Sequence, residues 1–208
     1  MKGIRKSFLW WTICVSIPLL GLVSYACYIE LKTGTPHADL QANEKRSVTE
    51  GRWQDFTSKE YGFTVLMPVP PTERVNTQDT PLGSMEVHSF ISETGSVAFA
   101  VSYVRYSHAD EFDKLTSKSA EKVFDQFRDG SLGKDGKLLR EGPIIFQTFP
   151  GREIEMTKLN GQAHMTMRIY RINSGLLTLT ALVPKHYNDR NSVPRFLDSF
   201  HLVGSSTN

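Results

Sequence analysis

An Asn-Gly pair at residues 160–161 restricts the fold of this chain more than any other feature. Asn-Gly is the strongest short-range signal for a tight β-hairpin. The segments on either side, FPGREIEMTKL and QAHMTMRIYRI, alternate apolar and polar residues. Folding the chain at this pair places Met156 opposite Met165 and Ile154 opposite Met167 on one face. The segment therefore predicts two antiparallel strands with one face directed to a core.

The opposite face of this hairpin is charged. The same register places Glu153 across from Arg168 and Glu155 across from Thr166, with Glu155 diagonal to His164. A cross-strand ion pair is the first interpretation, and such a pair contributes about 0.2–1 kcal/mol. The alternative is a ligand site that includes the next strand, joined through Asn173-Ser174-Gly175 as a three-residue turn. The candidate ligand residues are then Glu153, Glu155, His164, Arg168, Tyr170, Thr178 and Thr180.

A second hairpin is predicted from residues 85–91 and 97–103, which also alternate. Glu93-Thr94-Gly95 suits a three-residue loop with the glycine in the left-handed conformation. This loop would place Ile91 opposite Val97. Its apolar residues then match across the two strands, which favours this register.

Strands are also expected before and after these hairpins. Residues 53–67 predict two short strands that end at the prolines from Pro68 onward. Residues 137–147 predict a strand interrupted at Gly142-Pro143. Pro150-Gly151 then predicts the turn that begins the next strand.

Two helices complete the predicted domain. Residues 110–128 carry apolar side chains at helical spacing, and Gly130 suits the helix end. Residues 192–202 predict a short C-terminal helix with Ser192 as the N-cap. Its apolar patch, which we expect to dock on the sheet, consists of Phe196, Leu197 and Phe200.

Residues 8–29 form an uncharged apolar run, FLWWTICVSIPLLGLVSYACYI, preceded by Lys2, Arg5 and Lys6. A helix of about 20 residues spans the roughly 30 Å hydrocarbon core of a bilayer. Basic residues stay on the cytoplasmic side of a membrane. The run therefore predicts a single-pass signal anchor in the cell membrane, with residues 1–7 in the cytoplasm and the body of the chain extracytoplasmic.

Two other interpretations of this segment stay open. Ser24-Tyr25-Ala26 is a small-x-small sequence of the kind that signal peptidases cleave, which would give a secreted protein. Lipidation at Cys27 would give a lipoprotein, although the usual leucine three residues earlier is absent. In each case residues 30–51 predict a polar linker, residues 52–203 a folded domain and residues 204–208 a disordered tail.

Charge and cysteine content argue against nucleic-acid binding and against thiol chemistry in the body of the chain. The chain has 24 Lys and Arg against 22 Asp and Glu, and without the three basic residues before the apolar run the balance is 21 to 22, a net charge of −1. A near-neutral body lacks the basic stripe that nucleic-acid binding requires. Both cysteines, Cys14 and Cys27, lie in the apolar run, so the body has no disulfide or thiolate chemistry.

Short catalytic and metal-binding motifs have better structural interpretations. Ser119-Ala120-Glu121-Lys122 matches SxxK, but it lies within a predicted helix, and the KTG sequence at residues 32–34 precedes it instead of following it. GSLGKDGK at residues 130–137 departs from a phosphate-binding loop in spacing and lacks its Ser or Thr. The six histidines form no HxH or HExxH motif. We therefore expect no catalytic residue, no metal and no cofactor.

Several segments together resemble one known group of proteins. They are EYGFTVLMPVPP, VAFAVSYV, FRDGSLG, FPGREIEM, MRIYRI and RFLDSFHL, in that order. Over residues 53–203 the chain resembles small bacterial exported domains of the PsbP/Mog-type superfamily, which includes the extrinsic PsbP proteins of photosystem II and the Ran-binding Mog proteins. The resemblance implies an α+β fold, an antiparallel β-sheet flanked by helices as an α/β/α sandwich. It also implies binding or assembly rather than catalysis, and it carries over no catalytic residue.

The sequence as a whole predicts a membrane-tethered extracytoplasmic binding or assembly domain. Its expected partner is another protein, because catalytic motifs are missing and the resemblance is to binding domains. The alternative is a binder of a small ligand or an envelope polymer on the polar face of the sheet.

Overall fold

The computed structural model describes residues 53–80, 83–107, 117–172 and 175–203. Within these ranges the elements in chain order are β1 (Gln54–Ser58), β2 (Phe63–Met67), β3 (Thr72–Thr80), β4 (Gly83–Thr94), β5 (Val97–Tyr106), α4 (Ser117–Leu132), β6 (Lys137–Phe146), β7 (Phe149–Lys158), β8 (Ala163–Ile172), β9 (Gly175–Pro184), α5 (Ser192–Asp198) and β10 (His201–Leu202). The predicted membrane span, linker and tail lie outside these ranges. Among the described residues, no helix combines the length and apolar character needed to cross a bilayer.

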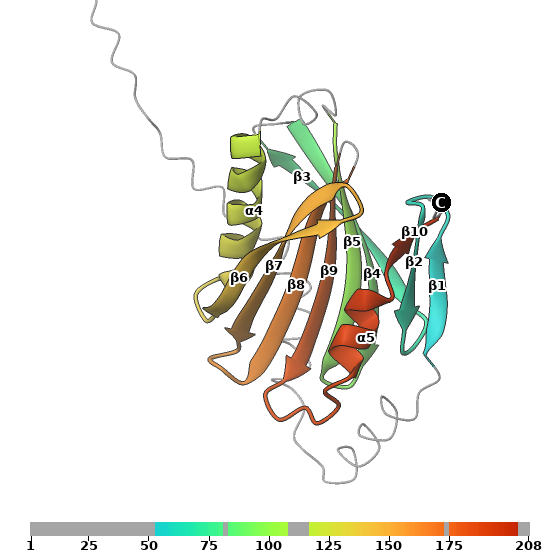
Figure 1. Ribbon diagram of the computed structural model, residues 1–208, viewed down its shortest axis with the longest axis vertical. Coiled ribbons are helices and arrows are strands. Elements are labelled where there is room, and N and C mark those ends of the chain that lie inside the picture. Colours follow the sequence, from blue (N-terminus) through green and yellow to red (C-terminus); the bar gives the residue numbers. More distant parts are fainter. Residues whose placement is uncertain (1–52, 81–82, 108–116, 173–174, 204–208) are drawn as a thin grey trace, which may run out of the picture.

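The described strands form two antiparallel sheets (Figure 1). The large sheet has seven strands in the order β3-β4-β5-β9-β8-β7-β6, and the small sheet has three in the order β1-β2-β10. Both sheets are antiparallel because most of their strands are joined by short hairpins. The predicted α+β class with an antiparallel sheet is therefore confirmed.

Side chains on the two faces of the large sheet belong to two different hydrophobic clusters. Val123, Phe124 and Phe127 of α4 pack with the first cluster, which includes Met167 and Ile169 of β8. The second cluster contains the next residue of β8, Tyr170, together with Phe99 of β5, Phe196 of α5 and several residues of the small sheet. The rings of Phe99 and Phe196 lie 5.1 Å apart, so α5 docks on the sheet as predicted. Successive residues of a strand face opposite sides of the sheet, so β8 contributes side chains to both clusters.

The end of α4 is fixed by a buried lysine. The helix continues to Leu132, beyond the predicted end at Gly130, and Gly133 follows with φ +58° in the left-handed position. Lys158 of β7 is 5% exposed and donates its Nζ protons to the carbonyl oxygens of Ser131 (2.8 Å) and Leu132 (2.9 Å). A cation at this position satisfies the last carbonyls and complements the helix dipole. Residues 130–137 therefore form a helix end and a turn, as expected of a segment that is not a phosphate loop.

Asp135, which follows the end of α4, also binds Lys158 and the residue after it. Its carboxylate lies 3.2 Å from Nζ of Lys158 and accepts the backbone N–H of Leu159 at 2.8 Å. Burial alone would raise the pKa of Asp135, but the N–H of Leu159 and the ammonium of Lys158 lower it by more, so its pKa lies below the usual value.

The free energy of unfolding is expected to decrease in acid, because protonation of Asp135 removes its interactions with Lys158 and Leu159. A carboxyl group with a lowered folded-state pKa stabilises the fold above its unfolded-state pKa of about 3.9 and loses that contribution as the pH falls through the folded-state value. Thermal melts at about pH 7 and about pH 3 should show Asp135→Asn less stable than wild type at the higher pH, with the difference shrinking at the lower pH. A difference that stays constant between the two values would contradict this role.

The register of the central hairpin agrees with its prediction. Met156 pairs with Met165, Ile154 with Met167 and Glu153 with Arg168. Leu159 to Gln162 form the connection, and Leu159, Asn160 and Gly161 all have positive φ. The Asn-Gly pair thus marks the turn correctly, within a loop of four residues.

The predicted registers of the other two hairpins are wrong. Ile91 pairs with Ala100 instead of Val97, because the loop has only two residues, Gly95 and Ser96; Gly95 is left-handed as predicted, with φ +57°. Ile172 pairs with Gly175, which also leaves two residues between the strands and places Ile169 opposite Thr178. A register that changes by an odd number of residues moves side chains to the other face of the sheet.

Two smaller predictions also need correction. Gly142 and Pro143 do not interrupt β6, whose irregularity lies between Leu138 and Arg140. Pro150 and Gly151 belong to β7, because the turn precedes them at Gln147, where φ is +55°.

The C-terminal helix differs from its prediction at both ends. It ends at Asp198, and the following residues His201 and Leu202 pair with β2 as strand β10. The N-cap position is Asn191, and the hydroxyl of Ser192 donates instead to the carbonyl oxygen of Asp189 at 3.0 Å.

Candidate functional site

A row of alternating charges crosses strands β6, β7 and β8 and ends at α5. Nη2 of Arg140 contacts Glu155 at 2.6 Å and Glu153 at 2.8 Å. Glu153 also accepts Nε of Arg168 at 2.8 Å, and Nη1 of Arg168 donates to Asp198 at 2.7 Å. We call these five residues the charge row. The predicted ion pair between Glu153 and Arg168 is confirmed, and it belongs to this larger group.

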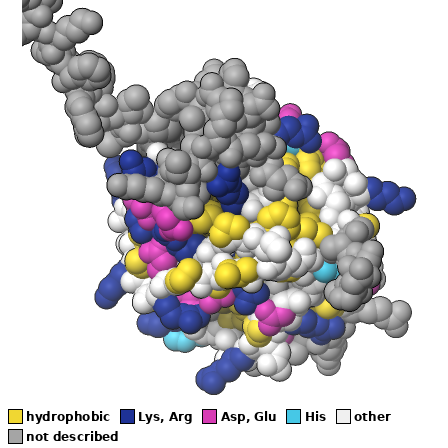
Figure 2. All heavy atoms as spheres, turned by 45° about the horizontal axis from the view of Figure 1, so that its top comes forward, with side chains coloured by type: hydrophobic (Ala, Val, Ile, Leu, Met, Phe, Trp, Pro, Cys, Tyr) yellow, Lys and Arg dark blue, Asp and Glu magenta, His cyan; other side chains and the backbone are white. Residues whose placement is uncertain are grey.

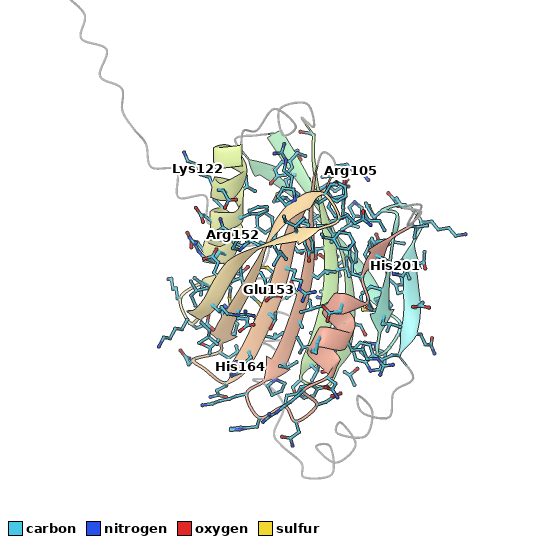
Figure 3. All side chains as sticks on the ribbon, in the orientation of Figure 1. Arg105, Lys122, Arg152, Glu153, His164 and His201 are labelled. Atoms are coloured by element: carbon cyan, nitrogen blue, oxygen red, sulfur yellow. The ribbon has the colours of Figure 1, made fainter. Side chains whose placement is uncertain are left out.

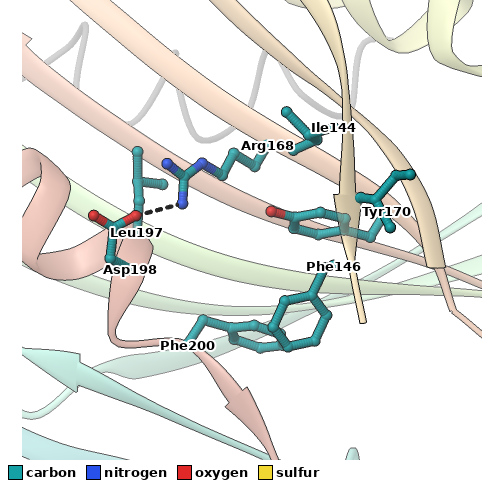
Figure 4. Close-up of a pocket in the computed structure, with 8 residues that line it drawn as sticks. Ile144, Phe146, Arg168, Tyr170, Leu197, Asp198 and Phe200 are labelled. Atoms are coloured by element: carbon teal, nitrogen blue, oxygen red, sulfur yellow. Dashed lines mark hydrogen bonds and ion pairs between the residues drawn. The ribbon is translucent and has the colours of Figure 1, made fainter. Parts of the chain in front are cut away.

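A pocket of about 350 Å³ lies beside Arg168. It opens between the end of β6 and the end of α5, and Figure 4 shows the side chains around it. The ring of Phe146 lies 5.5 Å from that of Tyr170 and 5.2 Å from that of Phe200, so the three rings form a continuous aromatic wall. The complete lining consists of Ile144, Ile145, Phe146, Arg168, Tyr170, Leu197, Asp198 and Phe200.

The position of Tyr170 depends on a glycine in the neighbouring strand. Gly151 of β7 pairs with Tyr170 of β8. A Cβ atom at residue 151 would lie 2.5 Å from Cδ1 of Tyr170 and would overlap the carbonyl oxygen of Ile169. The glycine thus leaves the space that the tyrosine ring occupies, and the ring lines the pocket.

Two polar groups of the pocket, Tyr170 and Arg168, have raised pKa values. Burial raises the pKa of the Tyr170 hydroxyl, so this phenol stays protonated at neutral pH and is available as a hydrogen-bond donor. Burial would lower the pKa of Arg168, but its bonds to Glu153 and Asp198 raise that pKa by more. Arg168 is therefore a permanent cation whose charge is already matched by two carboxylates.

The structure brings together only part of the predicted ligand patch. Glu153, Arg168 and Tyr170 lie at or beside the pocket, and Glu155 joins them through Arg140. His164 pairs with Thr157, four residues along β8 from Arg168, which corresponds to about 13 Å at the rise of a β-strand. Figure 3 shows His164 near the end of the sheet, away from Glu153.

Thr178 and Thr180 lie on the opposite face of the sheet from Arg168. They pair with Ile169 and Met167, which point into the cluster packed against α4. This correction follows directly from the two-residue connection between β8 and β9. The predicted patch of seven residues is therefore not a single surface.

Sequence reasoning missed most of the pocket. The sequence predicts a strand over Ile144, Ile145 and Phe146, and two adjacent isoleucines in a strand face opposite sides. Ile145 is 78% exposed, the highest exposure among the exposed large hydrophobic residues of the described chain. Asp198 and Phe200 reach the pocket through the docking of α5. The apolar patch of the helix predicts this docking, but no local pattern indicates where on the sheet the helix lies.

A second group of charges joins α4 to the other face of the sheet. Arg152, whose side chain is 12% exposed, contacts Asp125 (2.7 Å), Glu141 and Glu121, and its guanidinium lies 5.5 Å from the centre of the Phe124 ring. The bond to Arg152 is the main reason that the pKa of Asp125 is lowered. Every partner of Arg152 belongs to α4 or β6, so we assign this group to the packing of the helix. Among the described residues, no set of three or more His, Cys, Asp or Glu is arranged to hold a metal ion.

Comparisons with known proteins give similarity at the level of structure. No protein-family model matches the sequence, and no curated protein matches it. The solution structure of cyanobacterial PsbP from Synechocystis is similar with a TM-score of 0.49 and 14% identity, covering 73% of this chain and 93% of that one. The crystal structure of PA94, a Pseudomonas aeruginosa protein of unknown function, gives a TM-score of 0.35 and 12% identity, covering 69% of this chain and 88% of that one. No family, site or partner is taken from either.

Proposed function

We propose that this chain is a non-catalytic binding domain that holds a partner protein in the pocket between β6 and α5. Residues 8–29 would anchor it in the cell membrane, with the domain extracytoplasmic. The observation that carries the proposal is a pocket walled by aromatic rings at an edge strand of the large sheet. It is supported by the 78% exposure of Ile145, which is next to the lining residues Ile144 and Phe146 in β6. Protein interfaces are typically centred on an apolar or aromatic anchor in such a pocket, with polar groups around it.

The surface around the pocket has the composition of an interface. The side chains of Arg140 and Asp198 are 66% and 64% exposed, and they lie at or next to the ends of the charge row. On the face of the molecule that Figure 2 shows, hydrophobic side chains are exposed among basic and acidic ones. Apolar surface that a monomer leaves exposed between polar residues is a common mark of a binding site.

Contacts through side chains are favoured over addition of a strand to β6. β6 is an edge of the large sheet, so its outer backbone groups are available in principle. Pro143 lacks an N–H group, and the irregularity between Leu138 and Arg140 bends the strand. Both features are known to protect sheet edges from pairing with another strand. We therefore place the partner in the pocket and not along the edge.

The polar groups of the pocket support binding more than catalysis. They are the guanidinium of Arg168, the carboxylate of Asp198 and the hydroxyl of Tyr170. Arg168 and Asp198 are bonded to each other, and the phenol is held in its protonated form. Nucleophilic catalysis needs a nucleophile beside a base, and this lining contains no serine, cysteine, lysine or histidine.

A small ligand is the second candidate for the same pocket. Small-molecule sites have volumes of about 300–1,000 Å³, and the pocket lies at the lower end of this range at about 350 Å³. The size therefore admits a small compound or one side chain of a partner. The exposure of Ile145 outside the cavity favours the protein partner.

The position of the contact site is testable by photo-crosslinking in cells that naturally make this chain. A photoreactive amino acid at Ile145 of the full-length chain should give one defined adduct with another protein. The matched control is Val75, an exposed residue of β3 at the other edge of the sheet, with 53% exposure. Adducts from Val75 and none from Ile145 would overturn the proposal, and an adduct with a compound of low mass at Ile145 would favour the second candidate.

A further inference from the structure

We propose that the group held in the pocket is a basic side chain of the partner, a lysine or an arginine, whose aliphatic stem lies on the aromatic wall. This inference rests on the proposed function, because it names the chemistry that the β6–α5 pocket recognises. It is carried by the charge row, by the position of Asp198 and by the three aromatic rings.

The charge row carries an excess of negative charge. It contains three carboxylates, from Glu153, Glu155 and Asp198, and two guanidinium groups, from Arg140 and Arg168, which gives a formal net charge of 2 − 3 = −1. The carboxylates occupy both ends of the row. The end at Asp198 reaches the pocket, so one of the two terminal carboxylates lies where a ligand would enter.

Asp198 has the capacity to bind a second cation. Its Oδ1 atom accepts Nη1 of Arg168 at 2.7 Å, and its side chain is 64% exposed. The bond to Arg168 uses the Oδ1 atom of this carboxylate. A carboxylate has about four lone-pair positions, so one bond to Arg168 leaves room for an ammonium or guanidinium group.

Arg168 is a poor receptor for an anion in this arrangement. Its Nε and Nη1 atoms already donate to Glu153 and Asp198. An anion entering the pocket would approach within a few ångströms of both carboxylates, or would have to displace Asp198. Like charges at such distances repel each other, whereas a cation is attracted. The presence of an arginine in the lining therefore does not make this an anion site.

The aromatic wall suits a cation on an apolar stem. Lysine and arginine place their methylene groups on apolar surfaces and leave the charged end at the edge. Phe146, Tyr170 and Phe200 line the pocket, and Phe146 is more exposed than Tyr170 (4%) and Phe200 (5%), so it offers the most ring surface. Aromatic rings also attract cations. A basic side chain would therefore use the rings and Asp198 together, which neither an anion nor a purely apolar group would do.

The test uses three probes of equal length that differ in charge: hexylammonium, hexanoate and hexanol. The full-length chain in zwitterionic nanodiscs is labelled on its isoleucine methyl groups, and their NMR shifts are followed as each probe is added. Ile144 and Ile145 line the pocket, and Ile154 and Ile169 lie in the other core as internal controls. We expect shifts at Ile144 and Ile145 only, with hexylammonium binding about fivefold more tightly than hexanol and hexanoate more weakly than hexanol.

Two variants separate recognition of charge from other effects. Asp198→Asn should remove the preference for hexylammonium over hexanol. Asp129→Asn is the matched control, because Asp129 is also 64% exposed and bonded to an arginine but lies on α4, away from the pocket. Asp129→Asn should leave the preference unchanged.

The outcomes distinguish this inference from the proposed function. Binding at Ile144 and Ile145 that favours hexanoate, or that is equal for all three probes, would overturn the inference and leave the pocket as a contact site. No shift of Ile144 or Ile145 with any probe would overturn the inference, and the absence of an Ile145 adduct in the crosslinking experiment would overturn the proposed function.

Discussion

Replacing Arg152 with methionine is expected to lower the free energy of unfolding by about 2–4 kcal/mol. Methionine keeps an unbranched apolar stem against Phe124 and removes only the guanidinium. Glu141, whose side chain is 19% exposed, and Asp125 then lose the cation that Arg152 supplies and keep their contacts with Arg128. Removing one partner of a buried ion pair costs about 3–5 kcal/mol when the remaining charge is fully buried, and the partial exposure of Asp125 and Glu121 reduces that cost.

Arg140 provides the matched control for this substitution. It also contacts two glutamates on the large sheet, but its side chain is 66% exposed. Ion pairs in contact with water contribute little to stability, so Arg140→Met should unfold close to wild type. Denaturant titration of the three proteins measures the difference, and hydrogen exchange should show faster opening of α4 in Arg152→Met only. Equal effects of the two substitutions would show that burial of Arg152 does not matter.

Replacing Gly151 with alanine is expected to cost about 2–4 kcal/mol of the free energy of unfolding. The new Cβ atom would overlap the carbonyl oxygen of Ile169 and lie 2.5 Å from Tyr170. The carbonyl belongs to the backbone of β8 in the middle of the large sheet, so it cannot move without disturbing the pairing on both sides. The ring of Tyr170 must move instead, and the aromatic wall of the pocket then changes shape.

Gly142→Ala is the control for Gly151→Ala. Gly142 lies in the adjacent strand β6, and a Cβ atom there would meet nothing within 4 Å. We expect the stability of Gly142→Ala to stay within about 0.5 kcal/mol of wild type. Thermal melts compare the two variants, and tyrosine NMR signals report on the pocket. If Gly151→Ala were as stable as Gly142→Ala, the close packing of Tyr170 on β7 would be refuted.

The sequence predicts the register of one hairpin, β7–β8, and fails for the other two. The β7–β8 register follows from the sequence because β7 alternates between a core face and a more exposed, charged face. β5 and β9 are buried on both faces over most of their length, so residues on either face can match across the pair, and the alternation in residues 97–103 does not select the register. In those two hairpins the register depends on the length of the loop. A three-residue loop ending in glycine and a two-residue loop are equally plausible from the sequence.

Two edge strands, β3 and β10, are hard to detect from the sequence for a different reason. β3 (Thr72–Thr80) was not predicted, because its sequence TERVNTQDT is polar, and the residues whose burial is described are exposed or partly exposed. Its position depends on pairing with β4 and not on a core of its own. The same holds for β10, whose two residues pair with β2 after a separation of more than 130 residues in the chain.

The residues of the candidate site are brought together by one hairpin and by two contacts between elements that lie farther apart. Glu153 and Arg168 are brought together by the hairpin and were predictable from it. Arg140 and the isoleucines of β6 join them through the β6–β7 pairing, and Asp198 and Phe200 through the packing of α5 on the sheet. Tertiary packing of this kind leaves no periodic signal in the sequence, which explains why the pocket was found only in the structure.

The central claim is that this chain recognises its partner at the pocket and not along the whole of β6. Comparing photo-crosslinking from two positions of that strand tests it most directly. Ile145 lies on the rim of the pocket, and Leu139 is exposed near the other end of the same strand, at 49%. The account predicts an adduct from Ile145 that is lost in Gly151→Ala, with little or none from Leu139. Equal adducts from both positions, or an adduct from Leu139 alone, would contradict it.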